Sequence, residues 1–263
     1  MNRYTSLLAA AALVAAPSLA QAHFQLVYTP EPLLEKPGAV ELGLIFWHPF
    51  DNGHAMDMGR PEQVFAVNHG KRIDLASSLV AKRFKGAGNE ADAWAVTLPV
   101  KKMGDYVVAV VPAPYLEGSE DIFIQQIAKS FLNLGELPTD WTEPLGLPTE
   151  IVPLTKPTNI PTGSTFSGCV LSEGKPVAGA EIEVEYIAAT PDLTRFAATA
   201  PSVSPPPGGA LVVTSDANGC FTYGLPKAGD WGFAALGTGP ETSFEGKEMS
   251  QDAVIWVRAR DLN

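Results

Sequence analysis

The sequence predicts a mainly β protein built from two β-sandwich domains, with one helix late in the first. Short segments rich in Val, Ile, Phe and Tyr recur along the chain, and 24 Gly and 23 Pro residues are spread between them. Strand-sized apolar segments at short intervals, with turn residues between them, are typical of β-sandwiches. The predicted strands are 39–47, 63–68, 93–100, 104–114, 150–154, 165–171, 180–187, 210–216, 220–226, 231–237 and 253–259.

Residues 1–22 have the layout of a secretory signal peptide. Arg3 precedes a short apolar run, residues 7–16, and Ala20-Gln21-Ala22 forms a small-x-small cleavage site. The run is shorter than the roughly 20 residues that a membrane helix needs, and no later stretch approaches that length. We therefore expect an exported protein of a bacterial periplasm that does not span the membrane and whose mature chain begins at His23.

The charge of the chain argues against a nucleic-acid partner. The sequence has 18 Lys and Arg against 29 Asp and Glu, a net charge of −11, which repels nucleic acid and anionic membranes. The sequence also lacks a nucleophile elbow, a zinc-protease motif and a P-loop. We therefore expect no enzymatic activity.

One segment of the first domain, residues 119–136, predicts a helix. Ser119 can cap its start, and Gly135 can end it. The apolar residues of the segment recur at helical spacing and would pack on a sheet; they are Ile124, Ile127, Phe131 and Leu134.

A proline-rich crossing, residues 138–161, indicates a boundary near residue 140. We therefore expect an N-terminal sandwich over 23–140, which contains the predicted site, and a C-terminal sandwich over 141–263. The order of strands and turns in the second segment resembles Ig-like or transthyretin-like modules. Its strand 180–187 places its acidic residues on one face, which predicts one wetted face; these residues are Glu181, Glu183 and Glu185.

The two cysteines, Cys169 and Cys220, form a natural pair in an oxidising compartment. If Val170 and Phe221 point inward, both cysteines point to the opposite face, and a disulfide can form. It would close a loop of about 50 residues, which contributes ~4 kcal/mol in the chain-entropy model. The alternative is two buried free thiols.

The four histidines all lie within residues 23–69 of the first domain, which makes this segment the best place for a metal site. If cleavage follows Ala22, the free α-amine of His23 and its ring Nδ1 can chelate one ion. A third nitrogen from another histidine would complete a histidine brace, which suits Cu(II) and is tolerated by Ni(II). The alternative is that His23 merely begins the first strand.

A second cluster lies in residues 46–65, where His48 and His54 bracket a tight turn. If residues 54–58 are extended, His54, Met56 and Met58 share one face, and Asp57 takes the other. Two thioethers would suit Cu(I), whereas imidazoles with a carboxylate suit Ni, Co or Zn. Packing in the core is the alternative for the methionines. The fourth histidine, His69, is expected to be exposed at a hairpin turn.

Several segments resemble a family of bacterial periplasmic proteins described as a domain of unknown function and as nickel uptake transporter family proteins. They are AHF (22–24), FWHP (46–49), GHAMDMGRP (53–61), EPLGLPTEIVPL (143–154) and GKPVAGA (174–180). Some members of that family accompany energy-coupling-factor-type nickel or cobalt importers. The resemblance implies nickel as the metal and such an importer as the partner.

We therefore expect a protein that captures Ni(II), or alternatively Co or Cu, and delivers it to a membrane importer. The expected ligands are His23, His48 and His54, with Met56, Asp57 and Met58 as weaker candidates. One alternative is a copper-handling protein or a copper oxidase with a histidine brace. The other is a metal-free binding module of the periplasm.

Overall fold

A computed structural model describes residues 23–207 and 210–262, so the predicted signal peptide, 1–22, lies outside the described residues. These residues form strands almost throughout, and the one helix among them is a 3-10 turn, Ala76–Ser78. The predicted mainly β fold with sandwich-type sheets is confirmed. In the described ranges there is no helix with the length and hydropathy needed to cross a membrane.

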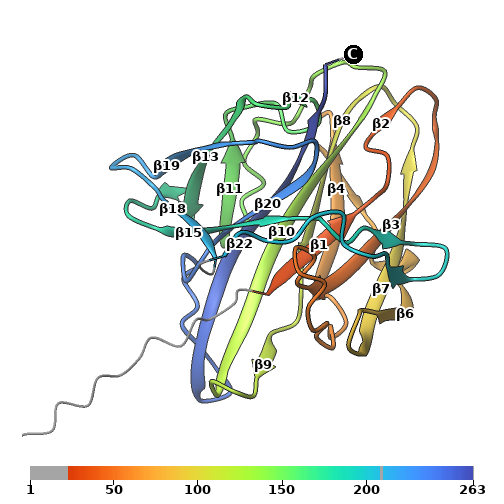
Figure 1. The fold of residues 1–263 in the computed structure, drawn as a ribbon. Coiled ribbons are helices and arrows are strands. Elements are labelled where there is room, and N and C mark those ends of the chain that lie inside the picture. The colour runs from red at the N-terminus through yellow and green to blue at the C-terminus, as the bar shows by residue number, and fades with distance from the viewer. Residues whose placement is uncertain (1–22, 208–209, 263) are drawn as a thin grey trace, which may run out of the picture.

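The largest sheet, here the central sheet, runs through the whole molecule (Figure 1). Its strands, in spatial order, are β18 (Leu211–Thr214), β15 (Glu181–Tyr186), β20 (Gly229–Ala235), β22 (Lys247–Arg260), β10 (Ile122–Leu134), β8 (Gly104–Val111), β4 (Gln63–Asn68) and β5 (Lys71–Asp74). Four short strands pair with the ends of two of these strands. β2 (Leu33–Leu34) and β9 (Tyr115–Glu117) pair with β10, and β12 (Ile160–Pro161) and β21 (Ser243–Phe244) pair with β22.

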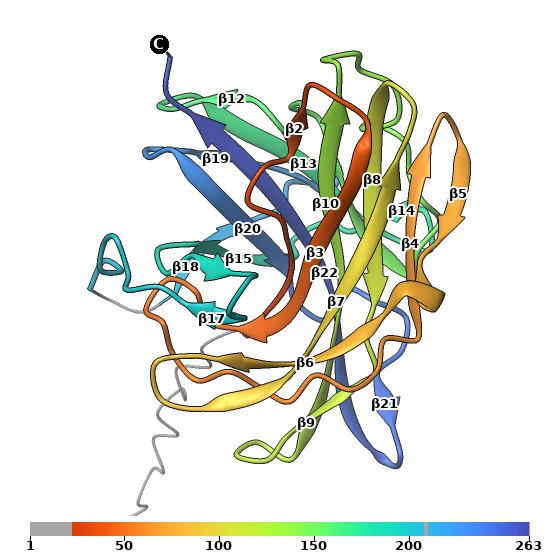
Figure 2. The same ribbon diagram turned by 90° about the vertical axis from the view of Figure 1, so that its right-hand side faces the viewer.

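Two smaller sheets lie on either side of the central sheet. The N-terminal sheet has the order β1 (Phe24–Tyr28), β3 (Gly38–Trp47), β7 (Glu90–Val100), β6 (Val80–Lys85), β17 (Ala197–Ala198) and β16 (Pro191–Asp192). The disulfide sheet consists of β11 (Thr149–Pro153), β13 (Thr165–Ser172), β14 (Lys175–Pro176) and β19 (Cys220–Gly224). Figure 2 shows β3 and β7 in front of the central strands β10 and β22.

Strand β22 contributes to two hydrophobic cores, one on each of its faces. Val254 and Trp256 pack in the core under the N-terminal sheet. The alternate residues, Ala253 and Ile255, pack in the core under the disulfide sheet. Because successive side chains of a strand point to opposite faces, the central sheet is buried on both sides here, and the two sandwiches share it.

The two predicted segments, 23–140 and 141–263, are joined by parallel pairing of β10 with β22. This pairing runs from Phe123 opposite Met249 to Lys129 opposite Ile255. The predicted boundary falls in the connection between β10 and β11. The division into two domains stays a prediction, while the central sheet is continuous across it.

The predicted helix over 119–136 is wrong, because most of this segment forms β10. A strand buried on both faces shows no apolar–polar alternation, so its apolar residues can match a helical spacing by coincidence. Ser119 does not cap a helix: its hydroxyl donates to Glu117 Oε1 at 2.7 Å in the turn between β9 and β10.

The predicted wet face of β15 is also wrong for two of its three acidic residues. Glu181 is exposed, but Glu183 and Glu185 are only 5% and 9% exposed. Glu185 Oε1 accepts a hydrogen bond from the backbone N–H of Phe50 at 2.6 Å. Burial raises the pKa of Glu185 well above its ordinary value. This carboxyl group therefore holds the chain just after His48 rather than solvating the sheet.

The predicted disulfide is confirmed. Cys169 and Cys220 lie opposite each other in the adjacent strands β13 and β19, and their sulfur atoms are bonded. Val170 and Phe221 are buried, so the two cysteines point to the other face of the sheet, as expected.

A buried ion pair connects β10 to the crossing that follows it. Lys129 Nζ lies 2.7 Å from Glu150 Oε2, and the two side chains are 1% and 3% exposed. Glu150 also accepts hydrogen bonds from the backbone N–H groups of Leu145 and Gly146. Burial lowers the pKa of Lys129, and Glu150 partly opposes that shift. Each charge is therefore compensated only while the other is present.

Replacing Lys129 with Met should destabilise the protein by about 3–5 kcal/mol, because it leaves the Glu150 carboxylate buried without its counter-ion. Urea unfolding monitored by circular dichroism measures this change. The exposed Lys85→Met provides the control and should cost less than about 1 kcal/mol. The double change Lys129→Met with Glu150→Gln should recover part of the loss. A single-variant cost no greater than the control would contradict the prediction.

Candidate metal-binding site

Three of the four histidines line one cavity of about 500 Å³ near the start of β1. His23 immediately precedes β1, His48 immediately follows β3, and His54 lies in the loop after the turn at 49–53. Strands β1 and β3 pair so that Phe24 lies opposite Trp47. This antiparallel register places the residue before one strand next to the residue after the other, and the rings of His23 and His48 are 4.6 Å apart between centroids.

A carboxylate that the sequence analysis missed completes this group. Glu117, at the end of β9, has its Oε2 atom 3.6 Å from His23 Nε2. It follows His54 by many residues and reaches the histidines only because the β9–β10 hairpin folds back over them, so no local spacing predicts it. Its Oε1 accepts hydrogen bonds from the backbone N–H and the hydroxyl of Ser119, which orient the carboxylate.

Hydrogen bonds fix the loop that carries His48 and His54. The carbonyl oxygen of His48 accepts a hydrogen bond from the N–H of Gly53 at 3.0 Å, which closes the turn. Asn89 lies beside His54, with its Nδ2 atom 3.3 Å from His54 Nε2, and it also donates to the carbonyl oxygen of Ala55. His54 is exposed, whereas His48 is buried.

Burial keeps two of the rings neutral. Burial is the main cause that lowers the pKa of His23, with Glu117 opposing it and His54 adding to it. Burial, followed by the neighbouring His23 and His54, lowers the pKa of His48 to about 3. The pKa of Glu117 is lowered overall, because burial, which would raise it, is outweighed by its hydrogen bonds with Ser119 and by His23. Neutral imidazoles and an ionised carboxylate are the forms that bind metal ions.

Within residues 23–207 and 210–262, the outer edge of β1 is held by side chains instead of a neighbouring strand. The N–H of Gln25 donates to Gln126 Oε1 at 2.9 Å, and the carbonyl oxygen of Gln25 accepts from Trp256 Nε1 at 2.9 Å. Gln126 in turn donates to Asp252 Oδ2 at 3.2 Å. The position of His23 over the cavity therefore depends on β10 and β22 of the central sheet.

The remaining predicted ligands do not line this cavity. Met56 and Met58 are buried in the core under the N-terminal sheet, which agrees with their alternative role in packing. They do not share an accessible face with His54. Asp57 is exposed and accepts a hydrogen bond from the N–H of Asp92 at 2.8 Å. His69, as expected, is exposed at the hairpin turn between β4 and β5.

The chemistry of the cavity suits a borderline metal ion. Imidazole and carboxylate ligands are typical of Ni, Co and Zn sites. Among the described residues, no group of three or more His, Cys, Asp or Glu is already close enough to hold an ion. The histidine rings and the Glu117 carboxylate are therefore loosely arranged, and their donor atoms would have to move closer together to bind an ion.

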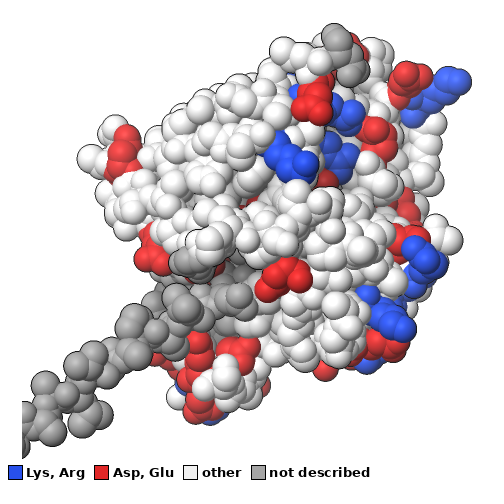
Figure 3. All heavy atoms as spheres, viewed as in Figure 1, with Lys and Arg blue, Asp and Glu red and all other residues white. Residues whose placement is uncertain are grey.

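The lining of the cavity is acidic. Figure 3 shows Asp and Glu side chains at the lower end of the molecule, where β9 lies in Figure 1, with some Lys and Arg atoms among them. Glu117 and Glu120 line the cavity itself, and none of its described lining residues is Lys or Arg. Such a surface attracts cations from solution.

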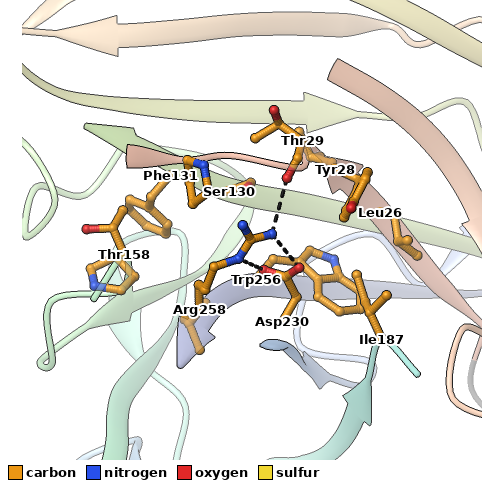
Figure 4. Close-up of a pocket in the computed structure, with 14 residues that line it drawn as sticks. Leu26, Tyr28, Thr29, Ser130, Phe131, Thr158, Ile187, Asp230, Trp256 and Arg258 are labelled. Carbon is orange, nitrogen blue, oxygen red and sulfur yellow. Dashed lines mark hydrogen bonds and ion pairs between the residues drawn. The ribbon is translucent and has the colours of Figure 1, made fainter. Parts of the chain in front are cut away.

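A second, much smaller cavity lies beside Arg258 (Figure 4). Its volume, about 20 Å³, is roughly that of one water molecule. Arg258 spans it by donating to Asp230 Oδ1 at 2.6 Å and to the carbonyl oxygens of Thr29 and Pro30. These contacts join the end of β1 to β20 and β22, so the small cavity is part of the packing rather than a ligand site.

The comparison with solved structures finds chains of low identity. The D0–D1 domain of intimin is 14% identical, with 87% of this chain and 95% of that chain covered and a TM-score of 0.22. A chimeric titin Z1Z2–Z1Z2 tandem is 13% identical over 91% and 99%, with a TM-score of 0.21. The fibronectin(III)-like modules of CbhA from Clostridium thermocellum are 7% identical over 90% and 95%, with a TM-score of 0.20.

The comparison with curated proteins finds no match. A family model does match, over residues 20–239, and its description is Domain of unknown function (DUF4198). The match covers most of the chain, including the N-terminal sheet, the three histidines of the cavity and both cysteines. The chain therefore belongs to the family of the domain of unknown function DUF4198.

Proposed function

We propose that this protein binds a transition metal ion in the periplasm and delivers it to a membrane importer. The observation that supports the proposal best is the convergence of His23, His48, His54 and Glu117 on one acidic cavity. These residues come from three separate segments of the chain. Core packing alone does not account for a cavity edge formed by three histidines and a carboxylate.

The proposed ion is Ni(II), with Co(II) and Cu as alternatives. Nickel rests on the resemblance to nickel uptake proteins, in which His23 and the segment from His48 to Met58 are the part that would carry metal binding. The ligand set agrees with it, because the burial of Met56 and Met58 leaves nitrogen and oxygen donors at the cavity. This removes the special support that two thioethers would give to a Cu(I) carrier.

The α-amine of His23 is the proposed additional ligand. Signal cleavage after Ala22 would free this amine, and together with the ring Nδ1 it would form a chelate on one ion. The hydrogen bonds of Gln126 and Trp256 with the backbone of Gln25, here the Gln25 clamp, hold His23 over the cavity. The chelate would therefore form where the His48 ring already lies. An amine ligand also compensates for the loose spacing of the side chains, because it adds a donor on the same residue.

Mature protein that begins at His23 should bind one Ni(II) tightly, and one extra Ala before His23 should weaken this binding at least about tenfold, or 1.4 kcal/mol. The added residue leaves every side chain in place but displaces the free amine. Isothermal titration with Ni(II), Co(II) and Cu(II) measures the effect, and His69→Ala is the matched control for a histidine outside the cavity.

The same titrations separate the alternatives. Tight Cu(II) binding with weak Ni(II) binding, followed by oxygen consumption in the presence of a reductant, would favour the copper oxidase. The absence of binding for all three ions would favour the metal-free binding module. Equal affinities with and without the added Ala would rule out the terminal chelate.

The metal-free protein should lose stability in mild acid through His48. An unfolded histidine has a pKa near 6.5 and takes up a proton below that pH, whereas folded His48, with a pKa of about 3, does not. Its contribution to stability is therefore present above pH 6.5 and is lost as the pH falls. Between pH 7 and pH 4.5 the wild type should lose about 2.5 kcal/mol more than His48→Gln.

Urea unfolding of the two proteins at a series of pH values measures this difference. Other titrating groups are common to both proteins and cancel. Parallel curves for the wild type and His48→Gln would show that the His48 ring is not held neutral by burial.

A further inference from the structure

The cavity is larger than a metal ion needs. Its volume is about 500 Å³, whereas an ion that keeps three water ligands takes up about 100 Å³, at roughly 30 Å³ per water. Cavities of about 300–1,000 Å³ are typical of small organic ligands. Most of the space beside the three histidines is therefore available to something other than the ion.

The wall that faces this space is polar and fixed. It is formed by Gln126 of β10, Glu183 of β15, and Ser250 and Asp252 of β22. Asp252 Oδ1 accepts hydrogen bonds from the Ser250 hydroxyl at 2.6 Å and from the N–H of Gly237 at 2.8 Å, and Asp252 Oδ2 accepts from Gln126 at 3.2 Å. These bonds hold the wall in one conformation, as a binding surface requires.

The lining of the cavity also includes apolar side chains, which come from Ile122, Ile124 and Leu236. A cavity with mixed apolar lining and a few fixed polar groups is the usual form of a site for a small organic molecule. A hydrated ion bound by the histidines gains no binding energy from these apolar side chains.

The charges of the cavity select the kind of molecule. Four carboxyl groups line it, from Glu117, Glu120, Glu183 and Asp252, and no Lys or Arg is among its described lining residues. An anionic chelate, such as a metal citrate, would be repelled. A chelate that is neutral or positive and carries N–H donors would meet hydrogen-bond acceptors and an opposite charge.

We propose that the cargo of the site is a metal ion already chelated by a small amine- or imidazole-bearing ligand such as an amino acid. The histidines take coordination positions that the chelator leaves open, and the wall of Gln126, Glu183 and Asp252 accepts hydrogen bonds from its N–H groups. This inference rests on the proposed function, because it assigns the form in which the ion enters the same cavity.

Equilibrium dialysis with radiolabelled L-histidine and Ni(II) tests the inference. Mature protein should retain about one labelled histidine per chain when Ni(II) is present and essentially none when Ni(II) is omitted. Labelled citrate with Ni(II) should not be retained. Citrate should instead remove Ni(II) from the protein at concentrations at which L-histidine does not.

The wall can be tested separately from the histidines. The variant Glu183→Gln keeps the size of the side chain and removes its charge, and it leaves unchanged Asp252, which accepts from Gln126 beside β1. It should weaken the retention of labelled histidine at least tenfold more than it weakens the binding of Ni(II) alone. Glu143→Gln, an exposed change outside the cavity, is the control and should alter neither.

The outcomes distinguish the inference from the proposed function. If Ni(II) binds but labelled histidine stays in solution, or removes the ion as citrate does, the chelate inference is overturned while metal binding stands. If neither Ni(II) alone nor Ni(II) with histidine binds, the proposed function fails as well. If Glu183→Gln does not fold, the comparison of histidine with citrate on the wild type still tests the chelate inference.

Discussion

The parallel pairing of β10 with β22 is the constraint on which the rest of the structure depends. It brings residues near 125 beside residues near 250 and makes one central sheet from both halves of the chain. Each face of that sheet then supports a smaller sheet and a core of its own. The buried ion pair of Lys129 with Glu150 follows from this arrangement, because β10 has no solvated face on which a lysine could lie.

The position of the first strand is a consequence of the same pairing. The side chains of Gln126 and Trp256 come from β10 and β22. They satisfy the backbone of Gln25 on the edge of β1 that pairs with no other strand of the described residues. An edge strand with free N–H and C=O groups would otherwise be open to solvent or to another chain. This Gln25 clamp fixes the position of His23 at the cavity, so a site that includes His23 depends on β22.

The sequence predicts those features that depend on local chemistry. Turn residues between short apolar segments identify most strands, the cysteine count gives the disulfide, and the clustering of His23, His48 and His54 identifies the cavity edge. The features that it does not predict depend on long-range burial. β10 loses its alternation because both faces are covered, Glu183 and Glu185 look like surface residues, and Glu117 joins the histidines only through the β9–β10 hairpin.

The cavity has a rigid part and an accessible part, which agrees with the proposed capture and release of a metal ion. His23 and His48 are largely buried and are fixed by strands, whereas His54 is exposed and lies on a loop. Two fixed donors reduce the ordering that binding requires, because less conformational freedom is lost. An exposed third donor can leave an ion without unfolding of the core. A carrier needs both properties, because a fully enclosed set of ligands would bind its cargo but would exchange it slowly.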